Sequence, residues 1–295
     1  MPFLANDRLV PELSHGDLLL NISADTPDAS LFALRQLLRQ VRSSMILEWM
    51  IEGFNRHENV GTGRAPARNL LGFKDGTANL QPGDDDTMDE HVWVAEDDGE
   101  PEWAVGGSYM AVRTIRMFVE FWDRTPLREQ EALIGREKES GAPIGGTEET
   151  DPVDFADDPD GELIRLDSHI RLANPRTPET AGDLMLRRGF SYSRGFDDTG
   201  QLDQGLCFVS FQRTLQSFLD VTERLNGEPL EEYILPVGGG FFYALPGVED
   251  EDDWYARALF EATPRGTTPS PPDDEPPPPS DEDVPPEPDQ VTASD

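Results

Sequence analysis

Two short segments hold most of the side chains in this sequence that could do chemistry. Residues 66–80 are dense in Gly, Asn and Asp, and residues 74–77 within them read Lys-Asp-Gly-Thr, which is typical of a tight turn. Residues 167–175 contain His169, one of only four histidines. A carboxylate can transfer protons and a neutral imidazole can bind a metal ion. Taken alone, however, such a turn and such a histidine are more often structural than functional.

The other histidines are weaker candidates. His15 and His57 flank predicted turns, which favours surface positions. His91 follows an acidic run at residues 84–90, but that run lacks the alternating Asp, central Gly and terminal Glu of an EF-hand loop. We therefore interpret this run as a solvated loop rather than a calcium site.

The composition excludes several classes of function. The chain has 59 acidic and 24 basic residues, a net charge of −35 and a pI near 4.2, which argues against nucleic acid as a partner. The single cysteine, Cys207, excludes an intrachain disulfide and the paired-cysteine motifs of zinc sites and covalent haem. No apolar run reaches the roughly 20 residues of a membrane span, and no leader-like segment opens the chain. We expect a soluble protein without a membrane partner, cytoplasmic as the sequence stands.

The hydrophobic pattern predicts one complete α+β unit. Apolar and β-branched runs that indicate strands alternate with segments of helical spacing in the order β-α-β-β-α-β, which is the ferredoxin-like sandwich. The predicted elements are a strand at 109–122, a helix at 127–136, strands at 184–192 and 206–212, a helix at 214–225 and a strand at 240–245.

The first part of the chain predicts only half of such a unit. Strands are expected at 17–24 and 46–54, and a helix between them carries Leu31, Leu34, Leu38 and Val41 at helical spacing after a Thr-Pro start signal. Half of an antiparallel sheet exposes an unpaired edge and an apolar face. The pattern therefore predicts that the chain begins within a domain. We expect a protein that aggregates readily or needs a partner for its stability.

These patterns predict four consecutive regions. Residues 1–65 form a partial first ferredoxin-like domain, 66–106 a connecting segment, 107–248 a complete second domain and 249–295 an acidic extension. From residue 264 the extension is so rich in Pro, Asp and Glu that we expect it to be disordered.

Four motifs together resemble the dye-decolourising peroxidase family, in particular its deferrochelatase/peroxidase branch. They are the GxxDG loop at 72–77, the segment Asp-Ser-His-Ile-Arg at 167–171, an Arg-Arg-Gly strand at 186–190, and residues 205–212. The resemblance covers about residues 6–248. It implies non-covalent haem b in the second of two ferredoxin-like domains, and reduction of hydrogen peroxide with electrons from dyes or phenols.

The resemblance also implies roles for individual residues. His169 matches the histidine that ligates the haem iron, and Asp75 matches the acid that moves the proton of the peroxide. Arg187 matches the arginine that stabilises charge on the cleaving O–O bond, with Arg188 as the alternative one position along.

Further residues are implied in haem binding. Glu232 matches the acidic partner of the ligand histidine, with Glu231 as the alternative. Arg136 and Lys138 resemble the segment near the haem propionates, although cations also favour an ordinary helix C-terminus. The remaining cofactor-binding candidates lie in the GxxDG loop: Gly72, Lys74 and Gly76.

Three functions follow from the resemblance: a peroxidase, a deferrochelatase-like protein that releases iron from haem, or a non-catalytic haem-binding remnant. The implied partners are hydrogen peroxide and a small-molecule electron donor, with a homo-oligomer as a further option. Members of this branch are often exported by the twin-arginine route. Surface aromatic residues could relay electrons from large donors, the candidates being Trp93, Trp103, Trp122 and Tyr192.

Overall fold

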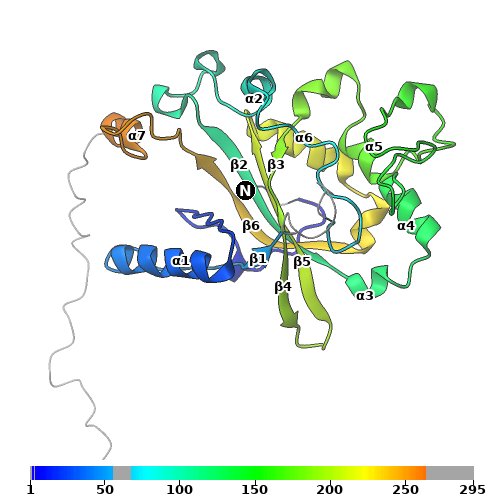
Figure 1. Cartoon of the computed structure of the whole chain (residues 1–295), viewed down its shortest axis with the longest axis horizontal. Coiled ribbons are helices and arrows are strands. Elements are labelled where there is room, and N and C mark those ends of the chain that lie inside the picture. The colour runs from blue at the N-terminus through cyan, green and yellow to red at the C-terminus, as the bar shows by residue number, and fades with distance from the viewer. Residues whose placement is uncertain (1, 3, 56–67, 264–295) are drawn as a thin grey trace, which may run out of the picture.

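The computed structural model describes residue 2 and residues 4–55 and 68–263 (Figure 1). Three features of the sequence analysis lie outside these ranges. They are His57, the expected boundary between residues 65 and 66, and the acidic tail from residue 264.

A single antiparallel sheet organises the described residues. Its strands follow the order β1-β4-β5-β2-β6, and β3 also pairs with β5. In the second unit the first strand, β2, lies between the third and fourth strands, β5 and β6, and the second strand, β4, is next to β5. This is the ferredoxin-like order, so the predicted fold class is confirmed. The strands are β1 (Gly53–Phe54), β2 (Ser108–Met117), β3 (Leu186–Arg187), β4 (Phe190–Phe196), β5 (Leu202–Gln212) and β6 (Ile234–Ala244).

Helices lie on both sides of this sheet. Figure 1 shows α3 to α6 on one side and α1 on the other. None of the helices in the described ranges is long and apolar enough to cross a membrane. The helices are α1 (Pro27–Val41), α2 (Asp85–His91), α3 (Val119–Trp122), α4 (Leu127–Ile134), α5 (His169–Ala173), α6 (Leu215–Leu225) and α7 (Arg257–Ala262).

The two faces of the sheet have different cores, because alternate residues of each strand point to opposite faces. On one face Phe208 and Phe241 pack against Phe218 of α6. On the other face Cys207 and Val209 belong to a cluster that is covered by three side chains of the first 55 residues, Leu19, Trp49 and Ile51.

The N-terminal segment of residues 8–15 follows the outer edge of β6. The backbone N–H groups of Arg8, Val10 and His15 donate to carbonyls of β6 at 3.0, 2.8 and 2.8 Å. A side chain at Gly238 would place its Cβ 2.4 Å from the carbonyl oxygen of Leu13, so this approach requires glycine. The segment thereby covers a strand edge that would otherwise be open.

The expected strands of the first unit form only in part. The helix is confirmed as α1, but residues 17–24 are extended without strand pairing, and of residues 46–54 only Gly53–Phe54 pairs, with β4. A β-strand needs a neighbour, and these segments have none within the described ranges. Many of their apolar side chains are exposed, among them Leu18, Leu20, Ile46, Leu47 and Met50.

Three smaller predictions are also corrected. The strand expected to continue to Trp122 ends at Met117, because the chain turns at Phe118 into α3. The acidic run expected as a loop forms α2, whose first turn is capped by the Asp84 carboxylate accepting the Thr87 N–H. Strand β6 begins six residues earlier than predicted.

Candidate active site

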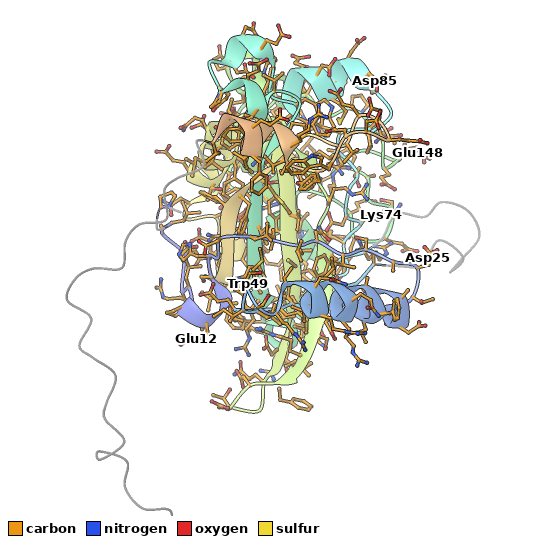
Figure 2. All side chains as sticks on the ribbon, turned by 90° about the vertical axis from the view of Figure 1, so that its left-hand side faces the viewer. Glu12, Asp25, Trp49, Lys74, Asp85 and Glu148 are labelled. Carbon is orange, nitrogen blue, oxygen red and sulfur yellow. The ribbon has the colours of Figure 1, made fainter. Side chains whose placement is uncertain are left out.

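The GxxDG loop is held in place on both sides of Asp75. Lys74 forms an ion pair with Glu149 at 2.7 Å, and the Thr77 hydroxyl donates to the other carboxylate oxygen of Glu149 at 2.9 Å. Burial disfavours the carboxylate of Glu149, but these hydrogen bonds outweigh it and lower the pKa of Glu149. Lys74 and Glu148, the neighbour of Glu149, lie on the same side of the molecule (Figure 2). Lys74 therefore supports the loop instead of facing the site.

The two glycines of the loop differ in their surroundings. Both have positive φ, +85° at Gly72 and +94° at Gly76, which favours glycine. A Cβ at Gly72 would lie 2.5 Å from the Lys138 side chain, whereas a Cβ at Gly76 would meet no atom within 4 Å. Gly72 thus allows close packing, while Gly76 borders open space beside Asp75.

Asn79 joins the loop to the strand that carries Arg187. Its side-chain amide accepts from the Arg187 N–H and donates to the Arg187 carbonyl, both at 2.8 Å. This two-point contact holds β3 against the loop that contains Asp75. Arg188 next to it is exposed, so Arg187 is the arginine that faces inward.

The Arg187 guanidinium has no hydrogen-bond or ion-pair partner within the described ranges, and neither has the Asp75 carboxylate. Burial lowers the pKa of Arg187, and the charge of Asp75 partly offsets this effect. A desolvated cation without a direct partner is unusual in a folded protein. Such a group is suited to bind an anionic or polar ligand.

His169 is the first residue of α5, and Glu228 holds its ring. The distance from its Nδ1 to Oε2 of Glu228 is 2.8 Å, and the Glu228 side chain is only 3% exposed. The imidazole itself is 35% exposed, and its other nitrogen, Nε2, has no hydrogen-bond partner within the described ranges. A carboxylate on Nδ1 fixes the tautomer that leaves a lone pair on Nε2, which is the arrangement of a histidine that ligates a metal.

The prediction that Glu232 or Glu231 contacts His169 is wrong. Glu232 is exposed, and Glu231 instead accepts the Gly227 N–H at 3.1 Å. Helix α6 ends at Leu225, and the turn through Asn226 and Gly227 brings Glu228 directly beneath the imidazole. The sequence signal was a carboxylate placed immediately after a helix-ending glycine.

His169, Asp75 and Arg187 are close enough to influence one another electrostatically. Burial disfavours the imidazolium form of His169, but the charge and hydrogen bond of Glu228 outweigh this and raise the pKa of His169. Arg187 lowers that pKa and Asp75 raises it, and both effects are smaller. The three residues come from separate elements and lie within electrostatic range of one another.

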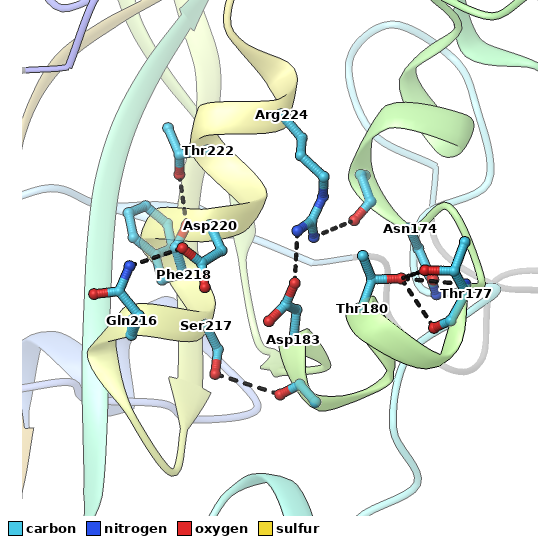
Figure 3. A network of polar contacts seen from close by, with 12 residues as sticks. Asn174, Thr177, Thr180, Asp183, Gln216, Ser217, Phe218, Asp220, Thr222 and Arg224 are labelled. Atoms are coloured by element: carbon cyan, nitrogen blue, oxygen red, sulfur yellow. Dashed lines mark hydrogen bonds and ion pairs between the residues drawn. The ribbon is translucent and has the colours of Figure 1, made fainter.

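Arg224 of α6 anchors the helix that carries His169. Its guanidinium donates to the carbonyls of Leu172 and Ala173, at the end of α5, at 3.2 and 3.4 Å. It also pairs with Asp183 at 2.6 Å, in the turn that follows α5 (Figure 3). Sequence reasoning missed this anchor, because it depends on contacts between distant segments.

The two residues predicted to lie near the haem propionates, Arg136 and Lys138, have different surroundings. Arg136 is buried and donates to the carbonyls of Gly141 and Glu149 at 2.7 and 3.0 Å. Burial lowers the pKa of Arg136, and the positive charge of the Arg176 guanidinium lowers it further, so a nearby anion would be favourable. Lys138 instead donates to Gln130 at 2.6 Å and lies over an aromatic ring, so it packs the loop.

Comparisons with known proteins match most of the described region. A family model of the Dyp-type peroxidase C-terminal part matches residues 66–249, and one of the N-terminal part matches residues 1–55. The chain belongs to the Dyp-type peroxidase family. The expectations of family and of non-covalent haem b, the cofactor of this family, are thereby confirmed.

The individual relatives agree with this membership. A protein of Escherichia coli strain K12 named Deferrochelatase is 53% identical over 256 residues, covering 86% of this chain and 60% of its own. Ferric DtpA from Streptomyces lividans superposes with a TM-score of 0.81 at 35% identity, over 88% of this chain and 70% of its own. The DyP-type peroxidase of Cellulomonas bogoriensis gives 0.79 at 34% identity, over 88% and 71%. The chain thus spans about 60% of the length of the curated relatives it matches.

Proposed function

We propose that this chain is a haem-dependent peroxidase that reduces hydrogen peroxide with electrons from small organic donors. The observation that supports the proposal is the hydrogen bond between Nδ1 of His169 and Glu228, with Asp75 and Arg187 within electrostatic range of the imidazole. The donor set fits haem. It offers the second imidazole nitrogen of His169, the Arg187 guanidinium, which has no direct partner among the described residues, and two arginines, Arg136 and Arg176, whose charges suit propionates.

Each residue has a distinct task in this proposal. Nε2 of His169 would hold the iron, and Arg136 with Arg176 would balance the propionate charges. The bound haem supplies the electrons that cleave the peroxide O–O bond. Asp75 accepts a proton from one peroxide oxygen and returns it to the departing one, so that water leaves. Arg187 stays protonated and stabilises the negative charge that develops on that oxygen.

Reconstitution with haem followed by rapid mixing with peroxide tests these assignments. The parent protein is expected to show a Soret band that shifts when peroxide is added. Asp75→Asn should slow that shift by about 10²–10⁴-fold, because the proton transfer is lost. Asp85→Asn, which changes an exposed acid on α2, is the matched control and should react like the parent. A peroxide reaction of normal rate in Asp75→Asn would refute the role of Asp75.

Release of iron from haem is a second candidate, favoured by the name of the Escherichia coli relative, Deferrochelatase. The two functions leave different products. Peroxidase turnover returns the intact haem, whereas iron release leaves iron-free protoporphyrin. Fluorescence of protoporphyrin after incubation of the haem-loaded protein, with and without peroxide, distinguishes them.

A further inference from the structure

Strand β3, which carries Arg187, is only two residues long. It pairs with β5 through Leu186 and Arg187. The N–H of the next residue, Arg188, donates to the Val209 carbonyl of β5 at 2.7 Å. In an antiparallel ladder, residues that bond to the neighbouring strand alternate with residues that do not. The backbone N–H and carbonyl of Arg187 therefore point away from β5, towards the outer edge of β3.

The Asn79 side chain covers this outer edge at Arg187. A primary amide carries the same donor and acceptor as a peptide group, and Asn79 uses both of them. Its Oδ1 accepts the Arg187 N–H and its Nδ2 donates to the Arg187 carbonyl, each at 2.8 Å. One side chain thus takes the place of a neighbouring strand. Without it, both backbone groups of Arg187 would lose their partner, since neither bonds to β5.

Asn79 is itself fixed to the segment that carries Asp75. Its backbone N–H donates to the Gly76 carbonyl at 3.1 Å, which closes a turn directly after Asp75. The next residue, Leu80, packs against a buried cluster that includes Leu186, the neighbour of Arg187. Asn79 therefore joins the loop of Asp75 to a strand that lies 108 residues further along the chain.

The positions of Asp75 and Arg187 depend on this backbone link. Their charges act on each other, but their side chains form no direct hydrogen bond or ion pair in the described part of the chain. The distance between them is therefore set by the two segments that carry them. Groups that react together must be held to within about 0.5 Å of their productive geometry. The two bonds from Asn79 fix the point on the backbone from which the Arg187 side chain starts.

We propose that Asn79 is a positioning residue, which sets the distance between Asp75 and Arg187 and aims the Arg187 guanidinium at a small anionic or polar ligand. The inference rests on the proposed function, because it concerns the same site. Asn79 takes no part in the chemistry itself but acts through the backbone of Arg187. Its removal should therefore change the properties that depend on the guanidinium and leave those that depend on His169 unchanged.

Amide hydrogen exchange, measured by NMR, tests the link in the protein without cofactor. In Asn79→Ala the Arg187 N–H loses its acceptor and should exchange about tenfold faster than in the parent. Asn21→Ala, which removes an exposed amide from the N-terminal region, is the matched control and should exchange like the parent at Arg187. An unchanged exchange rate of the Arg187 N–H in Asn79→Ala would overturn the link.

Binding of sodium fluoride to the ferric haem-loaded protein, followed by visible absorption, tests the aim of the guanidinium without any turnover. Arg187→Leu should weaken fluoride binding about 10–100-fold, because a charge-assisted hydrogen bond to the anion is lost. Asn79→Ala should weaken it about tenfold, since the guanidinium is kept but displaced. The double variant should bind fluoride like Arg187→Leu, because a residue that acts only through Arg187 has no effect once the guanidinium is gone. The affinity for haem should be the same in Asn79→Ala and in the parent.

The outcomes separate this inference from the proposed function. Parent-like fluoride affinity in either single variant, or losses that add up in the double variant, would overturn the positioning role. A parent protein that loads haem and binds fluoride as expected but does not react with peroxide would contradict the proposed function alone. If Asn79→Ala melts well below the parent, Asn79→Asp replaces it. That variant keeps the size of the side chain but not the donor to the Arg187 carbonyl, and it should also bind fluoride about tenfold more weakly.

Discussion

The N-terminal 55 residues and the second unit contain similar apolar side chains but bury them to very different extents. In β2 and β5 such side chains as Val112 and Val209 are 2% exposed, whereas Ile46 in the first part is 93% exposed. The second unit has four strands in register, so each strand shields its neighbours. In the first part, residues 17–24 have no strand neighbour within the described ranges. The burial of apolar side chains therefore depends on whether their segment has neighbouring strands, and not on its composition.

A buried ion pair of Asp7 and Arg113 links the two regions. Asp7 is fully buried and Arg113 on β2 is 3% exposed. Asp7→Asn should reduce the free energy of unfolding by about 3–5 kcal/mol, because a buried guanidinium loses its carboxylate. Denaturant melts of Asp7→Asn and of the exposed control Asp25→Asn measure this. A loss below 1 kcal/mol would show that the N-terminal segment stabilises the sheet mainly through its backbone contacts.

A second prediction concerns the partner of His169. Glu228→Gln removes the charge beneath the imidazole and should weaken haem binding about 10–100-fold, the usual effect of losing such a partner. Glu232→Gln should bind haem like the parent, since Glu232 is exposed. Haem titration followed at the Soret band measures both. Equal losses in the two variants would argue against the Glu228 assignment.

A smaller effect is expected at the anchor of α5. Arg224→Met should lower the free energy of unfolding by about 1–3 kcal/mol, because charge-assisted hydrogen bonds to Asp183 and to α5 are lost. Hydrogen exchange at residues 169–183 should accelerate, while Arg128→Met on the exposed side of α4 should change neither quantity. Unchanged exchange in Arg224→Met would mean that α5 is held by packing alone.

The smallest change in stability is expected in the N-terminal region. Ile46→Lys should alter the free energy of unfolding by no more than about 0.5 kcal/mol, since the side chain makes little contact. Concentrated samples of Ile46→Lys should nevertheless scatter less light than the parent, because an exposed apolar side chain is replaced by a charge. A melting temperature lowered by several degrees would show that Ile46 is buried in the protein in solution.

Local patterns predicted the elements whose signal lies within one segment. The spacing of apolar residues found α1, α4 and α6, and the β-branched runs found most of β2 and β5. The expected strands at 17–24 and 46–52 failed, because periodicity reports a preference for extended structure but not the presence of a neighbour. The short α5 has too few residues for a periodic signal.

In the candidate site, too, local motifs predict some residues, whereas others depend on contacts between distant segments. Asp75, His169 and Arg187 lie in motifs that resemble those of the family, and in the structure the charges of Asp75 and Arg187 act on His169. Glu228, Asn79 and Arg224 were missed, because their roles depend on where distant segments meet. The predicted partner, Glu232, lies four residues after the carboxylate that contacts the ring, Glu228. The end of α6 and the turn after it decide which acidic side chain reaches His169.

The contact of residues 8–15 with β6 has a practical consequence for any dissection of the chain. Although these residues lie far from β6 in sequence, they complete one border of the sheet that carries Arg187 and packs against α6. A fragment that starts at residue 66 would lose this border, and fragments of that kind would be prone to pair with one another at the bare strand. Cleavage between the two parts by a protease, by contrast, would leave the border in place, and the nicked pieces should elute together.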